Sequence, residues 1–209
     1  MLKPLVINIF FTQISQLINL LKFRHLYYDS RHTLWYKRPD WFAVLGVPYL
    51  YEKRDLRLSY VVWQEAVNPH IVVEWLSPGT EKEDSGQSLR DVEKPPGKWE
   101  VYEKILRVPY YAIFDRYNSE FRIFQVHGHR YSEVNLSDNR FWIPDIELGL
   151  GVWIGNYKGV EIPWLRWYDS DGNWVLTGEE QKAKLLEEER LKTEKLLAQL
   201  KSLGIESNL

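Results

Sequence analysis

The spacing of apolar and polar residues predicts a buried strand with a carboxylate in its middle. Residues 69–78 are almost wholly apolar except for Glu74. A short run of β-branched residues bounded by prolines is typical of a buried strand in an α/β or mixed sheet. An isolated carboxylate is costly to bury, so Glu74 needs a partner: a metal ion, a cation or a proton.

The apolar pattern before this run predicts one helix and several strands. The helix covers residues 12–23 and is capped by Thr12, because apolar side chains recur there every three or four residues: Ile14, Leu17, Ile18 and Leu21. We expect strands at residues 33–36, 41–47 and 59–64. Asp40 stands directly before the second of these strands.

The pattern after Glu74 predicts a loop, a short helix and a β-meander. Residues 77–97 are rich in Ser, Gly, Pro and charge and predict a long loop. A helix follows from Lys98 to about residue 107, with Lys98 and Tyr102 on one face because they are four residues apart. The remaining predicted elements are strands at 110–114, 121–127 and 130–135, an edge segment at 141–154, and a terminal hairpin at 164–176 that turns at Asp171-Gly172.

The composition changes at residue 178 to Lys, Glu and Leu, which predicts two parts: a domain over residues 1–177 and a helical tail over 178–209. Several tail residues fall near heptad positions, but Arg190 interrupts that seam. The tail is therefore either a weak coiled coil or a solvated charged helix.

Charge and cysteine content narrow the class of function. The 27 basic and 29 acidic residues nearly balance, so any nucleic-acid site must be a local patch, for which the candidates are Arg31, Lys37, Arg38, Lys53, Arg54 and Arg57. The absence of cysteine excludes disulfides, thiol nucleophiles and cysteine zinc sites. No run is long enough to span a bilayer, and residues 5–11 lack a signal-peptide cleavage pattern, so we expect a soluble, cytoplasmic protein without a membrane partner.

The strongest constellation of chemical groups is Asp40, Glu74 and Lys98. Two carboxylates from neighbouring strands can hold a hard divalent cation such as Mg²⁺, or Mn²⁺ in its place. A nearby ammonium can orient water and offset charge on a phosphate. From spacing alone a purely structural alternative stays open, with Glu74 paired to an arginine, Asp40 at a strand end and Lys98 in solvent.

Four stretches carry a resemblance to a known family. They are Pro39-Asp40 before a strand, the run Val72-Val73-Glu74-Trp75-Leu76-Ser77-Pro78, Lys98 four residues before Tyr102, and residues 106–115. In this order they resemble the Uma-two family, which is similar to the PD-(D/E)XK nuclease superfamily.

The resemblance implies a restriction-endonuclease-like α/β fold: a mixed central sheet flanked by helices, extended by the β-meander and the C-terminal charged helix. It also implies a metal-dependent endonuclease that hydrolyses phosphodiester bonds in DNA. Asp40 and Glu74 would bind Mg²⁺ or Mn²⁺ together with the Trp75 carbonyl, and Lys98 would be the superfamily lysine moved from the strand to the next helix. The sequence departs from the pattern at Leu76, where the superfamily places its lysine, and at His70, where relatives often carry aspartate.

An alternative of a different class is a catalytically inactive module that keeps the fold. Such a module would bind nucleic acid or protein and would oligomerise through residues 179–203. A homodimer formed through the tail is compatible with either hypothesis and is required by the second.

Overall fold

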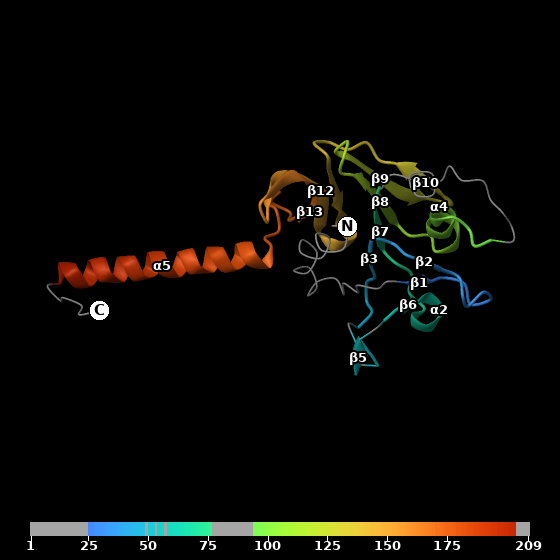
Figure 1. The fold of residues 1–209 in the computed structure, drawn as a ribbon, viewed down its shortest axis with the longest axis horizontal. Helices are drawn as coiled ribbons and strands as arrows, with labels where there is room; N and C mark the ends of the chain where they lie inside the picture. The colour runs from blue at the N-terminus through green and yellow to red at the C-terminus, as the bar shows by residue number, and fades with distance from the viewer. Residues whose placement is uncertain (1–24, 49, 53, 57, 77–93, 204–209) are drawn as a thin grey trace. The chain divides into compact units, whose positions relative to one another are not determined.

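The computed structural model describes residues 25–48, 50–52, 54–56, 58–76 and 94–203 (Figure 1). Its internal contacts divide the chain into two compact units, Met1–Val175 and Leu176–Leu209. The helix predicted over residues 12–23 and most of the predicted 77–97 loop lie outside the described residues. Each unit is described by itself below.

The first unit is built on a five-stranded mixed sheet. Its strand order is β10-β9-β8-β7-β3, with β3 at Trp41–Ala43, β7 at Ile71–Trp75, β8 at Tyr110–Asp115, β9 at Glu120–His127 and β10 at Arg130–Glu133. The β7 and β8 strands are parallel, and the other neighbours are antiparallel. The predicted buried strand, the meander and the mixed α/β sheet are therefore confirmed, although β3 is shorter than the predicted 41–47 strand.

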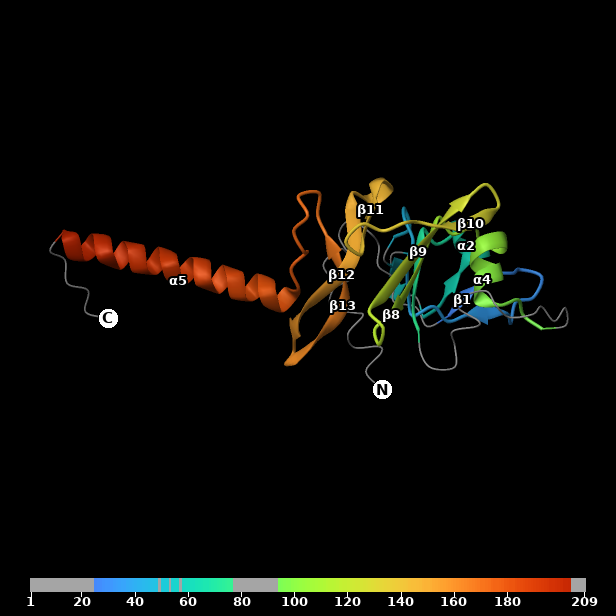
Figure 2. The same ribbon diagram turned by 90° about the horizontal axis from the view of Figure 1, so that it is seen from above.

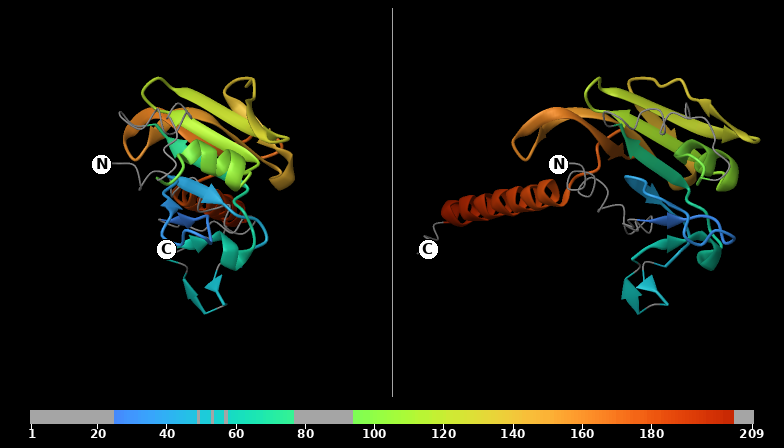
Figure 3. Two further views of the ribbon diagram at one scale, coloured as in Figure 1. Left: turned by 90° about the vertical axis from the view of Figure 1, so that its right-hand side faces the viewer. Right: turned by 45° about the vertical axis from the view of Figure 1, so that its right-hand side comes forward.

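One face of this sheet is covered by a short helical segment (Figure 3). Helix α4, Lys98–Glu100, continues directly into a π-helical turn, Val101–Ile105. Val101 and Tyr102 are fully buried and pack in one cluster with Val72, while Ile105 is exposed. The chain thus passes from β7 to the parallel strand β8 through the helix predicted at Lys98. The first turn of that helix lies over the sheet.

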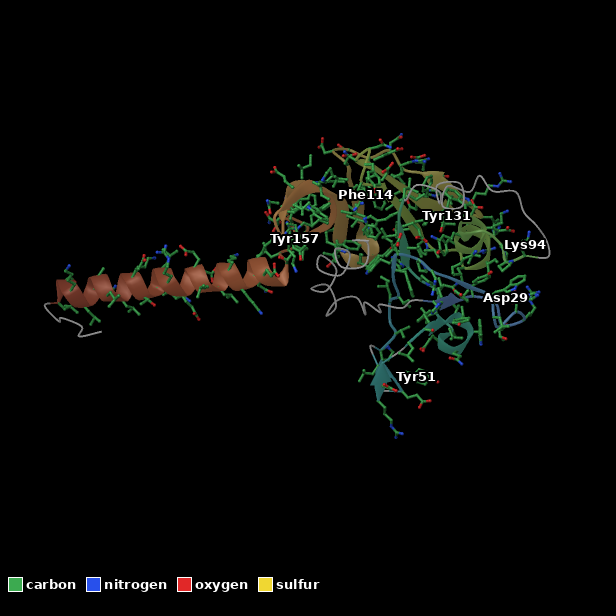
Figure 4. All side chains as sticks on the ribbon, in the orientation of Figure 1. Asp29, Tyr51, Lys94, Phe114, Tyr131 and Tyr157 are labelled. Carbon is green, nitrogen blue, oxygen red and sulfur yellow. The ribbon has the colours of Figure 1, made fainter. Side chains whose placement is uncertain are left out.

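The opposite face packs against a second, three-stranded antiparallel sheet (Figure 2). Its order is β11-β12-β13, with β11 at Arg140–Ile143, β12 at Leu148–Tyr157 and β13 at Val160–Tyr168; a 3-10 turn, Pro144–Ile146, joins the first two. Phe114 of β8 lies in the cluster between the two sheets, whereas Tyr131 of β10 packs on the α4 side (Figure 4).

The predicted edge segment at 141–154 is wrong. Its residues form β11, the turn at Pro144 and most of β12, and β12 is the central strand of the second sheet. Gly149 makes this possible, because a Cβ there would lie 1.9 Å from the Tyr168 ring on β13. The predicted 164–176 hairpin is reduced to a single bridge between Tyr168 and Trp174, closed by a turn in which Gly172 has φ +81°.

The segment before β7 forms small sheets. Strand β1, Leu26–Tyr27, lies between β2, Tyr36–Lys37, and β6, Tyr60–Val61, and a separate pair joins β4, Leu50–Tyr51, to β5, Asp55–Leu56. The strands predicted at 33–36 and 59–64 are mostly wrong: the chain turns between His32 and Trp35, whose rings stack, and helix α2, Val62–Glu65, begins directly after β6.

The second unit contains one long helix, α5, Gly178–Ser202. Thr177 caps it: its side chain accepts the Glu180 N–H at 3.2 Å, and the Glu180 carboxylate accepts the Thr177 N–H at 2.7 Å. This reciprocal pair satisfies two donors at the start of the helix. Among the helices of the described segments, we find none long and apolar enough to cross a membrane.

Candidate active site

Strand pairing brings the two predicted carboxylates together. Trp41 of β3 lies opposite Val73 of β7 in an antiparallel ladder, so Asp40, just before β3, lies beside Glu74. The Asp40 N–H donates to Glu74 Oε2 at 3.2 Å, and the Trp75 N–H donates to Asp40 Oδ2 at 2.8 Å. The Glu74 carboxylate is therefore held by the backbone of Asp40, and the Asp40 carboxylate by the backbone of Trp75, at one end of β7.

Glu74 points to the helical face of the sheet because side chains alternate along β7. Val73 belongs to the cluster between the two sheets, while Val72, two residues before Glu74, belongs to the cluster beneath α4. The Glu74 side chain is 0% exposed. Burying a charge to this degree requires close donors of positive or hydrogen-bonding character.

Those donors come from the first turn of the helical segment. Lys98 Nζ lies 3.0 Å from Glu74 Oε2, and the Tyr102 hydroxyl donates to Glu74 Oε1 at 3.0 Å. The Lys98 side chain is only 16% exposed, so solvent screens this ion pair weakly. The structure thus brings together Asp40, Glu74 and Lys98. The purely structural alternative expected an arginine beside Glu74, but the cation there is Lys98.

The four-residue spacing between Lys98 and Tyr102 explains why both reach one carboxylate. Residues four apart lie on the same side of a helix. The Tyr102 ring is buried and packs edge-on against Tyr111 of β8, with 5.2 Å between the ring centroids. Tyr102 therefore combines core packing with a direct bond to Glu74, and the predicted shared face with Lys98 was the sequence signal for that bond.

The donor set fits a hard divalent cation. Mg²⁺ in proteins is commonly held by one or two carboxylates, with water and substrate phosphate completing its coordination. Asp40 and Glu74 supply two such carboxylates. Within the described ranges no three His, Asp or Glu side chains lie close enough together to hold a metal ion. The described side chains therefore do not form a complete ligand set. Trp75 contributes its N–H to Asp40, and the role of its carbonyl as a ligand stays a prediction.

His70 lies before β7, four residues from Glu74, in a separate polar cluster. Its Nε2 is 3.4 Å from Asp145 Oδ2, and the Tyr110 hydroxyl donates to the same oxygen at 2.9 Å. Burial lowers the pKa of His70, and the Asp145 carboxylate opposes that effect. Burial also raises the pKa of Tyr110 to about 12, together with its hydrogen bond to Asp145. No spacing pattern predicted this cluster, because Asp145 comes from the distant β11–β12 turn.

The structure describes the surroundings of three residues of the predicted basic patch. Lys37 is buried, Arg31 bonds to Asp29, and Arg38 donates to His25 Nε2 at 3.2 Å. Lys53 and Arg57 lie outside the described residues, so the patch stays a prediction.

Comparison with known proteins gives one match. The model of the Uma2 family, described as "Putative restriction endonuclease", matches residues 9–157. A search of curated proteins and a search of solved structures each found no match. The matched segment contains Asp40, Glu74, Lys98 and Tyr102 and ends where β12 ends.

Proposed function

Because this chain belongs to the Uma2 family, we propose that Asp40, Glu74 and Lys98 are the active site of a metal-dependent DNA endonuclease. The observation that carries the proposal is the environment of Glu74. A fully buried carboxylate holds a lysine ammonium at 3.0 Å and lies beside a second acidic residue. Buried ionisable groups that lie this close together are typical of catalytic sites.

In this proposal Asp40 and Glu74 bind Mg²⁺ or Mn²⁺. A divalent cation polarises a phosphoryl oxygen and makes water a stronger nucleophile at neutral pH. The Trp75 N–H fixes one oxygen of Asp40, and the Tyr102 hydroxyl fixes one oxygen of Glu74. These bonds hold the two carboxylates in a set geometry before a cation or substrate arrives, which lowers the cost of organising the site.

Lys98 supplies the positive charge that phosphodiester cleavage requires. Negative charge accumulates on the phosphate oxygens in the transition state, and a preorganised ammonium in a dry environment stabilises that charge strongly. The bond to Glu74 Oε2 and the low exposure of Lys98 keep its ammonium at the site. We therefore assign Lys98 the part that the lysine two residues after the strand glutamate has in the related nucleases, since Leu76 occupies that position here.

DNA is the substrate that we propose, bound through local contacts. The formal net charge of −2 provides no general attraction to a polyanion. Binding should therefore depend on a few phosphate contacts near the site and should weaken steeply as salt rises.

Cleavage of supercoiled and linear DNA tests the proposal. The parent chain, Glu74→Gln and Lys98→Ala are incubated with Mg²⁺ or Mn²⁺, beside Lys104→Ala, which removes an exposed lysine from the same helical segment. We expect metal-dependent cutting by the parent and the Lys104 control, and a loss of roughly a hundredfold or more in the two site variants.

Two results would contradict the proposal. Cutting that survives Glu74→Gln would place the activity elsewhere. A parent chain that binds DNA but cuts with neither metal would favour the inactive binding module.

A further inference from the structure

Helix α5 exposes a row of leucines that the unit itself does not cover. None of its 25 residues is buried. Besides Leu191, which is 45% exposed, five leucines are 38% to 73% exposed, and Leu200 is partly covered. These five are Leu185, Leu186, Leu196, Leu197 and Leu203, the last directly after the helix. Isolated exposed leucines are ordinary on a protein surface, so their arrangement decides whether they form a binding face.

The six leucines lie on one side of α5. At about 100° per residue they occupy roughly a third of the helix circumference, and Leu191 points to the opposite side. Leu186 and Leu200 fall on one heptad position, and Leu196 and Leu203 fall on the other, with Glu189 and Thr193 completing the row. Leucines occupy four of these six positions, so the row is mainly apolar, as is the face that a helix presents to a partner helix.

The charges of α5 are divided between its two halves. Residues 178–189 contain five glutamates and two lysines, net −3, whereas residues 190–202 contain four basic residues and one glutamate, net +3. The helix dipole favours acidic residues in the first turn and basic residues in the last turn, so it explains only the charges at the two ends of α5. The acidic run 187–189 and the basic residues Lys192 and Lys195 lie in the middle of the helix, where that effect has faded.

This division favours a partner that runs in the opposite direction. In an antiparallel pair of identical helices the acidic half of each lies along the basic half of the other. In a parallel pair each half would face its own like charge, which is unfavourable. The leucine pairs 185–186 and 196–197 are symmetric about residue 191, so an antiparallel pair centred there also places one leucine pair opposite the other.

We propose that α5 pairs with α5 of a second copy of this chain as an antiparallel coiled coil centred near Leu191. The inference is independent of the proposed nuclease activity. Because residues 1–175 precede α5 in the chain, this pairing attaches the two first units to opposite ends of the coil.

The first test measures mass in solution for the full chain by light scattering at tens of micromolar. The variant Leu196→Ala/Leu200→Ala removes stripe side chains and keeps high helix propensity. Its control, Leu191→Ala, truncates one leucine on the opposite side of the helix. We expect a dimer for the parent and the control, and a dissociation constant raised roughly a hundredfold or more for the double variant.

The second test measures orientation. The chain has no cysteine, so single-cysteine variants take one spin label per copy. In the antiparallel pair, labels at Gln181→Cys lie about 20 residues apart along the axis, roughly 30 Å, because the helix rises 1.5 Å per residue. Labels at Thr193→Cys, which lies in the leucine row and faces the partner, are close in either orientation and report pairing itself.

The two tests distinguish the antiparallel pair from its alternatives. A dimer that requires the leucine stripe, with distant labels at 181 and close labels at 193, supports the proposal. A monomer, a dimer insensitive to Leu196→Ala/Leu200→Ala, or close labels at 181 would each overturn it.

Discussion

Replacing Lys98 by methionine keeps the length of the side chain and removes the ammonium that lies 3.0 Å from Glu74 Oε2. The Glu74 carboxylate then remains fully buried without its nearest cation. Removing one partner of a buried ion pair usually costs about 3–5 kcal/mol, because the other charge is left uncompensated. Glu74 still keeps the Asp40 N–H and the Tyr102 hydroxyl, so we expect Lys98→Met to cost about 2–3 kcal/mol in the absence of metal.

The double-mutant cycle with Glu74→Gln isolates the interaction. The double variant Lys98→Met/Glu74→Gln removes both charges, and its loss should be smaller than the sum of the single losses by about 2 kcal/mol. Lys104→Met serves as the control, since it removes an exposed ammonium from the same helical segment. Exposed charges of this kind contribute about 1 kcal/mol or less.

Urea unfolding followed by tryptophan fluorescence measures these free energies. All ten tryptophans lie between residues 35 and 174, inside the first unit, and α5 contains none. The signal therefore reports the unit that holds the site. Strictly additive losses, or a cost for Lys98→Met no greater than that of Lys104→Met, would refute the reasoning that Lys98 compensates a buried carboxylate.

Three further predictions concern other parts of the chain. Tyr102→Phe removes one hydrogen bond to Glu74 and keeps the buried ring, so it should lower the free energy of unfolding in urea by about 1 kcal/mol and weaken Mn²⁺ binding. An unchanged Mn²⁺ affinity would exclude a role of Tyr102 in positioning Glu74. Burial lowers the pKa of His70 below its ordinary 6.5, so the imidazole is protonated more readily in the unfolded chain than in the folded one. The midpoint of thermal unfolding should therefore be highest above about pH 6.5 and fall as the pH drops below that value. His70→Asn should flatten this fall. Thr177→Ala removes the side-chain half of the α5 cap, so it should cost about 1 kcal/mol of helix stability and lower the helical circular dichroism, while leaving tryptophan fluorescence unchanged.

The central part of the site could be predicted because its signals are local. A carboxylate inside an apolar run requires a partner, and the four-residue spacing of Lys98 and Tyr102 places both side chains on one helical face. The structure shows both features at Glu74. The meander over β8, β9 and β10 was also predictable, since its strands are neighbours in sequence and end at clear turn residues.

The parts that sequence reasoning missed depend on distant contacts. The central place of β12 follows from the close packing of Gly149 beneath Tyr168, nineteen residues further along the chain. The early end of β6 follows from a switch to α2, which short apolar runs do not distinguish from a continued strand. The pairing of His70 with Asp145 likewise joins two segments that no spacing rule connects.

Manganese binding tests the central claim most directly, since free Mn²⁺ has a strong electron paramagnetic resonance signal that is lost on binding. Titration of the parent chain, Asp40→Asn, Glu74→Gln and the Lys104→Ala control would measure the number of sites and their affinity. We predict one Mn²⁺ site for each parent and control chain, with binding weakened by roughly tenfold or more in both carboxylate variants. Binding that is equally strong after both substitutions would contradict the assignment of Asp40 and Glu74 as a metal centre.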